Sequence, residues 1–453
     1  MMKTRSLFNP LCGASLFLIL TASSFQTPAN ATSLSIGADI LARSVSMKER
    51  DITIPGIQYT DQRIKAYLIT DLSKDVEATV RVQSITPWGL ETSTNVLATR
   101  YPNANGTPWV QNAFVRLPNI WKGRIIVTAG RQPMQWGDGE ILSDDDLGFN
   151  AVRAQIKSPF QKIPFDTDFF TAKVTEGLRS AGGETDLTGA LLGFDRDLVR
   201  WELMSLWENS NTAQPYEMGA DTTAIVASNI KRQIMGVRFK ANLKDAYMKG
   251  AYYIQRGSIS RQKTSGVPDL TLGGAAYMFG LGGKSNTKYL GRFGALAEIA
   301  VGDGDDVNTP EKDEAFRPSY SSRWSGLERQ GYGRYFAATF SDAYSPSNSF
   351  APVNSTNDGL PAGTSGIQSV RFGVESTPWA PVTFTFDYYQ YKAQKNLSGP
   401  KELGTEFDYG FIYRYSGLVT VKGSMNTFNP GEAFPLLTRK TGNATNVEIE
   451  VKF

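Results

Sequence analysis

Hydrophobic and polar residues alternate along much of the chain. Between Val76 and Gln83, valine and alanine occupy one parity, and charged or polar residues occupy the other. Residues two apart in a strand lie on the same face of a sheet, so this pattern predicts strands with one apolar and one polar face. The pattern recurs at 199–203, 235–241, 292–299, 370–375 and 406–414. The chain is therefore expected to be all-β.

The spacing of these segments predicts eighteen strands, and the spacers alternate between very short turns, such as Ser73-Lys74-Asp75, and long connections. This asymmetry is typical of antiparallel transmembrane β-barrels with long extracellular loops, although a soluble sandwich also alternates. Counting 334–341 as a nineteenth strand would break the order of short and long connections. Sixteen strands result if 187–194 and 269–281 are not strands. The predicted strands are 33–43, 62–72, 76–86, 109–118, 124–135, 149–158, 167–176, 187–194, 199–208, 231–243, 247–256, 269–281, 290–301, 365–376, 382–392, 404–415, 418–427 and 445–453.

The two ends of the chain carry targeting signals. Two basic residues, an apolar stretch and Ala29-Asn30-Ala31 predict a signal peptide over 1–31, cleaved after Ala31. The remaining 32–453 is the expected barrel. The last strand ends at Phe453, which resembles the C-terminal signal read by the outer-membrane insertion machinery. We therefore expect the bacterial outer membrane, with its lipids as partners. Aromatic residues crowd strand ends, where an interfacial girdle would lie: Trp88, Trp109, Trp121, Trp136, Trp207, Trp379, Tyr388, Tyr391, Tyr413 and Tyr415.

Composition narrows the function further. The chain has 47 basic and 44 acidic residues, and this near balance argues against a nucleic-acid partner. Histidine is absent, which excludes serine–histidine hydrolases and imidazole acid–base chemistry. No other catalytic or cofactor-binding motif stands out. We therefore expect no enzymatic activity, no catalytic residue and no cofactor.

The polar parity of the strands should line a water-filled lumen, because an eighteen-stranded barrel is too wide to be filled by its own side chains. That parity carries sixteen basic and ten acidic side chains, an excess of about +6 that would favour anions. Alternatively, the charges pair across neighbouring strands and only keep the lumen wet. The candidate pore-lining or solute-binding residues are Arg81, Arg131, Asp138, Arg153, Lys173, Arg200, Arg238, Lys240, Arg292, Arg371, Glu406, Asp408 and Arg414.

Three acidic sites allow more specific expectations. Asp138 could form an ion pair with Arg131, or Arg131 could instead bind a uronate carboxylate. Glu406 and Asp408 share one strand face and could pair with Arg371 or Arg414. Asp303, Asp305 and Asp306 resemble the start of a calcium loop, but Val307 stands where that pattern needs an oxygen ligand, so we expect no metal.

The segment 302–364 is an exceptionally long connection that contains nine aromatic residues, from Phe316 to Phe350. A connection this aromatic should pack on itself or into the mouth of the pore. Aromatic faces also stack on sugar rings. The segment is therefore a candidate gate or plug.

Four stretches resemble the alginate export family of outer-membrane barrels. They are Ala129-Gly130-Arg131-Gln132 with Trp136-Gly137-Asp138-Gly139; Gly302-Asp303-Gly304-Asp305-Asp306 with Phe316-Arg317-Pro318-Ser319-Tyr320; Leu403-Gly404-Thr405-Glu406-Phe407-Asp408; and Phe428-Asn429-Pro430-Gly431-Glu432-Ala433-Phe434. This resemblance implies an eighteen-stranded monomeric barrel with an arginine-lined conduit for an anionic exopolysaccharide, working with a periplasmic export complex. The lumen charge of this chain is more mixed than the family's.

The sequence thus predicts an outer-membrane channel for an anionic saccharide, an exopolysaccharide or a small anionic solute. Two alternatives stay open. The same alternation fits a general diffusion porin, and the long external loops fit an adhesin or structural barrel that conducts no ions.

Overall fold

The structure, a computed structural model, describes residues 33–48, 56–88, 106–158, 164–175, 184–211, 214–217, 224–261, 269–306, 308–309, 311–322, 324–325, 327–340, 360–361, 363–396 and 399–453. The expected signal peptide over 1–31 lies outside these residues. Within them, helices are too short or too polar to cross a membrane.

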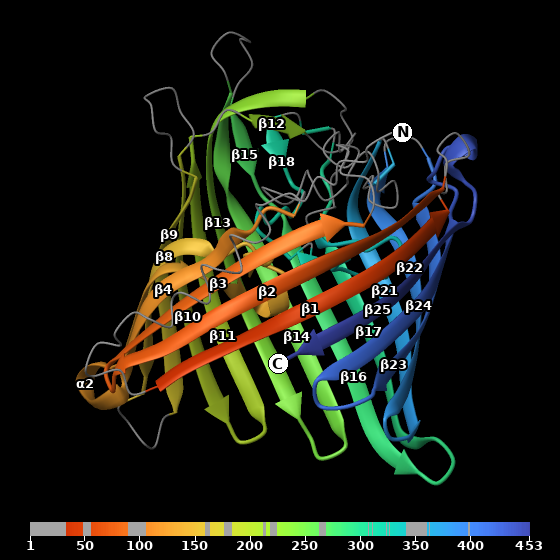
Figure 1. The fold of residues 1–453 in the computed structure, drawn as a ribbon. Coiled ribbons are helices and arrows are strands. Elements are labelled where there is room, and N and C mark those ends of the chain that lie inside the picture. Colours follow the sequence, from red (N-terminus) through yellow and green to blue (C-terminus); the bar gives the residue numbers. More distant parts are fainter. Residues whose placement is uncertain are drawn as a thin grey trace, which may run out of the picture.

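Eighteen strands form one closed antiparallel barrel, in which each strand pairs with the next along the chain and β25 pairs with β1 (Figure 1). The strands are β1 (Ser33–Lys48), β2 (Ile57–Ser73), β3 (Val76–Pro87), β4 (Trp109–Asn119), β5 (Ile125–Gln132), β8 (Phe149–Lys157), β9 (Phe165–Thr175), β10 (Thr185–Arg196), β11 (Val199–Ser210), β13 (Ala224–Asn242), β14 (Ala246–Arg261), β16 (Ala275–Thr287), β17 (Gly291–Gly302), β21 (Thr364–Trp379), β22 (Val382–Asn396), β23 (Glu402–Arg414), β24 (Val419–Pro430) and β25 (Gly442–Lys452).

The predicted all-β barrel of eighteen strands is confirmed. The two segments on which the sixteen-strand alternative depends, 187–194 and 269–281, correspond to β10 and β16, so that alternative is wrong. The second of these was misplaced at its start, because Leu270–Leu272 forms a separate short strand, β15, which pairs with β14 and with β18 (Lys312–Asp313). Residues 334–340 lie outside the barrel sheet, as the order of short and long connections required.

Short turns and long connections separate to opposite ends of the barrel (Figure 1). The turn between β10 and β11 closes over Asp197, whose φ is +53°. The turn between β4 and β5 is the short helical segment α2 (Ile120–Gly123), in which Trp121 and Lys122 also have positive φ. The connections at the other end include β12 (Gln214–Glu217), β15 and β18.

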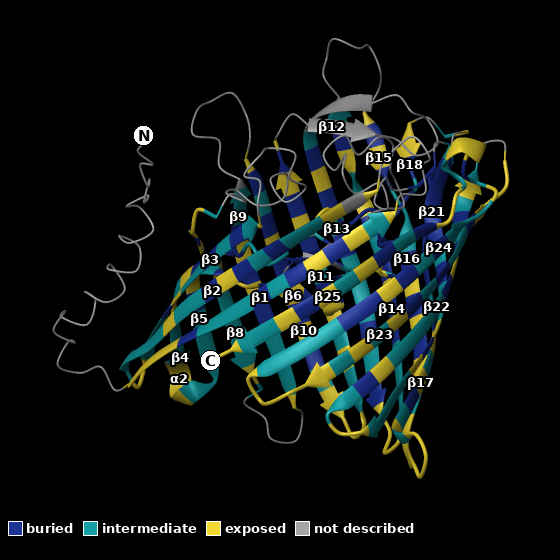
Figure 2. Ribbon diagram, turned by 45° about the vertical axis from the view of Figure 1, so that its right-hand side comes forward, coloured by how far each residue is buried: buried dark blue, intermediate teal, exposed yellow. Residues whose placement is uncertain are grey.

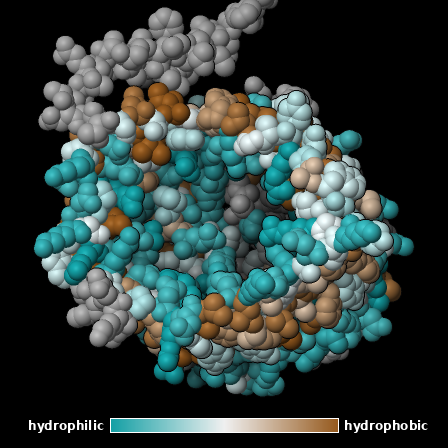
Figure 3. All heavy atoms as spheres, turned by 90° about the horizontal axis from the view of Figure 1, so that it is seen from below, coloured by the Kyte–Doolittle hydropathy of each residue, from teal (hydrophilic) through white to brown (hydrophobic). Residues whose placement is uncertain are grey.

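Apolar and polar residues face opposite sides of the wall. Large apolar side chains point outward, as at Phe372, which is 54% exposed, whereas Glu406 is fully buried on the inner side. Figure 2 shows exposed and buried positions alternating along the strands, and Figure 3 shows hydrophilic residues around the opening seen from below. Part of the girdle prediction was wrong: Trp109, Trp136 and Tyr391 are buried among inward-packed side chains.

Two segments between strands fold into the barrel. The first, residues 133–148 between β5 and β8, contains β6 (Gln135–Trp136), the short helical turn η3 (Gly137–Gly139) and β7 (Leu142–Ser143). The second comprises the described residues among 303–340, in the connection from β17 to β21, with β18, β19 (Trp324–Ser325) and β20 (Glu328–Arg329). We call them the short inner loop and the long inner segment. They touch each other, because Ser143 N donates to Tyr320 O at 2.6 Å.

Candidate functional site

Trp136 anchors the short inner loop to the wall. Its ring packs edge-on against Phe170 of β9 at 4.9 Å between centroids, and its indole Nε1 donates to Asp168 at 3.1 Å. The next three residues turn sharply, with φ values of +64°, +53° and +87° at Gly137, Asp138 and Gly139. Such backbone angles favour glycine, which explains the Gly-Asp-Gly sequence. The turn carries the Asp138 carboxylate into the lumen.

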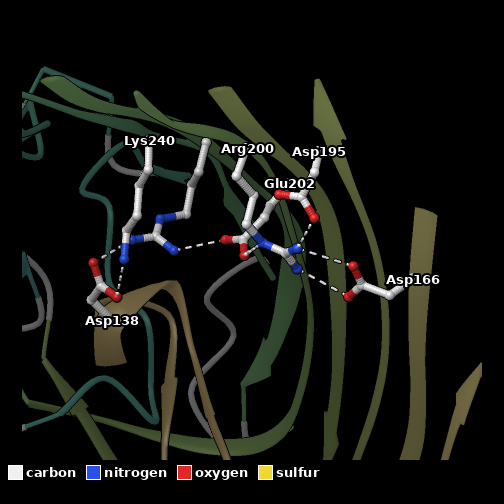
Figure 4. A network of polar contacts seen from close by, with 7 residues as sticks. Asp138, Asp166, Asp195, Arg200, Glu202 and Lys240 are labelled. Carbon is white, nitrogen blue, oxygen red and sulfur yellow. Dashed lines mark hydrogen bonds and ion pairs between the residues drawn. The ribbon is translucent and has the colours of Figure 1, made fainter. Parts of the chain in front are cut away.

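Asp138 ends a network of alternating charges along the wall (Figure 4). Its carboxylate accepts hydrogen bonds from Arg238 at 2.6 Å and Lys240 at 2.8 Å. Arg238 also bonds Glu202 at 2.8 Å, and Glu202 accepts from Arg200 at 3.0 Å. Arg200 bonds Asp166 and Asp195 as well, each at 3.0 Å. Three predicted pore-lining cations are therefore neutralised by carboxylates.

The pairing expected between Arg131 and Asp138 is wrong. The Nε of Arg131 donates to the backbone carbonyls of Gln111 and Leu147, at 3.2 and 2.9 Å. Asp138 is turned away from β5 toward β13, where Arg238 and Lys240 bind it. Arg131 therefore links the end of β5 to β4 and to the last residues of the short inner loop. These two backbone carbonyls occupy its Nε.

The long inner segment packs on the wall through aromatic rings at two places. Phe316 lies against Tyr253 of β14 at 6.2 Å and edge-on to Phe340 at 5.8 Å. On the opposite side of the lumen, Phe336 stacks on Phe428 of β24 at 4.9 Å, with the rings 3° from parallel. The segment therefore reaches across the barrel from β14 to β24.

Buried carboxylates hold the far end of this segment. Glu406 accepts hydrogen bonds from the backbone N–H groups of Tyr335 at 2.6 Å and Phe336 at 3.0 Å. It also accepts one from the hydroxyl of Tyr391 at 3.0 Å. Asp408 accepts from the backbone N–H of Arg334 at 2.9 Å. Carboxylates that receive several N–H donors are well suited to fix a chain that lacks a sheet partner.

The arginine partners predicted for Glu406 and Asp408 are therefore wrong. Arg371 bonds Asp387 of β22, at 2.8 and 2.9 Å, and Arg414 donates to the hydroxyl of Thr383 at 3.4 Å. A segment folded back into the lumen supplies the donors that the two carboxylates need. These donors do not lie on the strands next to β23, so the parity of neighbouring strands could not predict them.

A cavity of about 410 Å³ remains between the two inner segments and the wall. The short inner loop lines it with carboxylates, the long inner segment with Tyr332 and Phe340, and the wall with Arg81, Lys249 and Arg371. Burial raises the pKa of Glu140 to about 7, although Tyr253 donates a hydrogen bond to its carboxylate at 2.8 Å. Burial also raises the pKa of Asp144 to about 6.

Arg81 is distinctive among the cations of this cavity. Lys249 pairs with Glu298 at 2.5 Å, and Arg371 pairs with Asp387. No carboxylate among the described residues pairs with Arg81, whose guanidinium lies 5.7 Å from the centre of the Tyr67 ring. Its Nε is buried and has no hydrogen-bond partner in the described part of the chain. Arg81 is thus the lining cation best placed to receive an anion.

The other predicted residues have different environments. Arg153 faces inward and pairs with Asp168 at 2.6 Å. Arg292 is exposed near the short turns. Lys173 was wrongly assigned to the lumen, since it shares the strand parity of the outward Phe169 and pairs with Asp186 at 3.1 Å. Consecutive phenylalanines, Phe169 and Phe170, obscure the parity of β9 in the sequence.

The expected basic excess of about +6 is also wrong, because carboxylates that the sequence count omitted neutralise much of it. Asp166 and Asp168 face inward on β9 and bind Arg200 and Arg153. The short inner loop adds Asp138 and Asp146, the second bound to Lys65 at 2.6 Å. The sequence count also left out Arg43 and Asp61, which form a buried ion pair, and Arg232, which pairs with Glu208. The alternative of cross-strand pairing describes most of this lumen.

The acidic cluster after β17 is occupied by other partners. Asp303 accepts from the backbone N–H of Ala275, and Asp305 accepts from that of Glu314. Asp306 pairs with Lys395 at 3.1 Å. Over the described residues, histidine, cysteine, aspartate and glutamate side chains form no group able to hold a metal ion.

No family model and no curated protein matches the chain. Solved structures do resemble it. OccK9 (OpdG) of Pseudomonas aeruginosa is 10% identical over 93% of this chain and 98% of its own, with a TM-score of 0.54. OccK11 (OpdR) of the same organism is 9% identical over 95% and 99%, with a TM-score of 0.53. OccAB4 of Acinetobacter baumannii is 9% identical over 94% and 99%, also at 0.53. These neighbours are outer-membrane β-barrels, and at such low identity the likeness shows the fold alone.

Proposed function

We propose that the protein is a passive outer-membrane channel for small saccharides that carry a carboxylate. The observation that carries this proposal is Arg81, a cation without a carboxylate partner among the described residues, in a cavity that the partly buried Tyr332 also lines. A guanidinium binds a carboxylate through parallel hydrogen bonds, and aromatic faces suit the apolar faces of a sugar. Elsewhere in the lumen the charged side chains pair with one another. They keep the lumen hydrated without binding the solute tightly.

The test is single-channel recording of 32–453 in a planar bilayer under a salt gradient, with glucuronate or glucose added. We expect glucuronate to interrupt the current and Arg81→Gln to weaken the interruption about tenfold, the effect of one charge-assisted hydrogen-bonding group. Arg153→Gln is the matched control, because Asp168 already occupies that arginine. Equal effects of glucose and glucuronate would indicate a general diffusion porin instead. A barrel that passes no ions would contradict both readings and favour the adhesin.

A second candidate is export of a polymeric uronate. The four stretches that resemble the alginate export family all contribute to the inner segments here. Asp138 lies in the turn of the short inner loop, and Phe316 packs the long inner segment on the wall; Glu406 binds that segment, and Phe428 packs against it. A polymer would need the long inner segment to move. Oligouronates of increasing length separate the candidates, since long chains should block the current for longer only if they can thread the barrel.

A further inference from the structure

The outward face of the barrel has an apolar trough across β9, β10, β11, β13 and β14. Two small residues, Ala190 and Ser205, lie opposite each other at its floor. Phe169 pairs with Ala190 on one side, and Met235 pairs with Ser205 on the other. The trough encloses about 530 Å³, and apolar side chains form nearly all of its lining.

Two cations stand on the same outward face, beyond the trough toward the long connections. Arg256 lies two residues beyond Ile254, a trough residue on β14, and Lys231 lies four residues beyond Met235 on β13. Gln233 pairs with Arg256 and Lys231 pairs with Ser258, so the two cations are diagonal neighbours, about 7 Å apart at their Cα atoms. Both are exposed, and neither has an ion-pair or hydrogen-bond partner among the described residues.

Their surroundings fit the boundary between lipid tails and headgroups. Trp207 is 42% exposed and pairs with Gln233, at the level where an aromatic girdle meets the headgroups. Two other outward lysines near this end are neutralised: Lys173 bonds Asp186 at 3.1 Å, and Lys392 bonds Glu402 at 3.4 Å. Lys231 and Arg256 are therefore two cations without a carboxylate partner among the described residues, and they lie next to an apolar trough.

We infer that Lys231 and Arg256 bind the phosphate of an acylated, phosphorylated glycolipid of lipid A chemistry, with an acyl chain in the trough. The charge complements a phosphate, and the trough accepts a hydrocarbon chain while desolvating almost no polar surface. The long connections at this end place the site in the leaflet that faces outside. The inference rests on the proposed outer-membrane location, but not on the solute that the lumen passes.

The test is native mass spectrometry of folded 32–453 in detergent, titrated with lipid A, with dephosphorylated lipid A or with phosphatidylethanolamine. We expect a preference for lipid A, and about a tenfold or greater loss of affinity in the double variant Lys231→Gln/Arg256→Gln. Ala190→Trp should weaken binding by filling the trough while both cations remain. Lys392→Gln is the matched control and should bind as the unchanged protein does.

Three results would overturn the inference: equal binding of all three lipids, unchanged affinity in the double variant, or displacement of lipid A by millimolar inorganic phosphate, which would leave a simple anion site. Ion conductance of the same double variant is measured in parallel. Absence of a lipid A preference in the unchanged protein, with normal conductance, would reject only the lipid site. Lipid A binding by a barrel that conducts no ions would reject only the proposed channel.

Discussion

The two inner segments narrow the same lumen by different physical means. The short inner loop presents Asp138 to Arg238 and Lys240 through ion pairs, and the side chain of Asp138 is 48% exposed. The long inner segment is held by aromatic stacking on Phe428 and by Glu406, which is fully buried. The attachment at Asp138 is in contact with water, whereas the attachment at Glu406 is not; the short inner loop is also anchored at its start by the buried Trp136.

This difference predicts how each segment responds to conditions. Exposed ion pairs contribute little to stability and weaken with added salt. Buried carboxylates that accept backbone N–H groups are costly to disrupt, because the N–H groups would be left without partners. We therefore interpret the long inner segment as the fixed narrowing of the lumen and the short inner loop as the part that salt and pH can adjust.

The largest effect is expected from removing the fixed narrowing. Deleting 306–345 and joining the ends with a short glycine–serine linker should raise single-channel conductance severalfold, because the segment spans the lumen from β14 to β24. A shift in gel mobility on heating serves as the control for a folded barrel. Unchanged conductance in a folded deletion variant would place the segment outside the path of the ions.

Phe336→Ala should loosen the long inner segment without removing it. Phe336 is 4% exposed and packs against Phe428, Tyr391 and Phe434, so the substitution should cost roughly 3–5 kcal/mol of local packing. We expect faster hydrogen exchange in 327–340 and a noisier open current. Phe372→Ala on the outward face is the matched control, since that side chain is already 54% exposed. Equal exchange in the two variants would contradict the assignment of Phe336 as an anchor.

The barrel was far easier to predict from the sequence than these anchors. Alternation such as that of Val76, Ala78 and Val80 predicts each strand from its own residues. The order of short and long connections then excluded 334–341 as a strand. The partner of Glu406 lies some 70 residues earlier in a segment without regular alternation, so no local pattern points to it. The prediction of a partner for Asp138 failed for a similar reason. The direction of its side chain depends on the turn at Gly137 and Gly139 rather than on strand parity.

A smaller effect is expected from a change of pH, which acts on two carboxyls of the short inner loop. Burial raises the pKa of Glu140 to about 7 and that of Asp144 to about 6. Both carboxyls are protonated at pH 5 and ionised at pH 8, so anion preference should fall as the pH rises between these values. The loop conformation itself is favoured below the unfolded pKa near 4.5 and loses that stabilisation as the pH rises toward 7.

Reversal potentials in a salt gradient at pH 5, 6, 7 and 8 measure this change. In Glu140→Gln the step near pH 7 should vanish while the step near pH 6 remains, which separates the two carboxyls. The deletion of 306–345 provides a second comparison, since a cavity opened to bulk water should lose most of the pKa displacement. A reversal potential that is constant from pH 5 to pH 8 would mean that neither carboxyl faces the ions.

The smallest effect is expected on the outward face, where neither inner segment reaches. Lys173→Gln removes a cation that the sequence placed in the lumen but that pairs with Asp186 outside it, so anion preference should not change. Arg81→Gln removes one charge of the same sign from the cavity and should lower anion preference severalfold. Reversal potentials of the two variants give the contrast directly. A shift in Lys173→Gln as large as that in Arg81→Gln would mean that β9 presents its other face to the lumen, because a one-residue change of register exchanges the lipid and lumen sides of a strand.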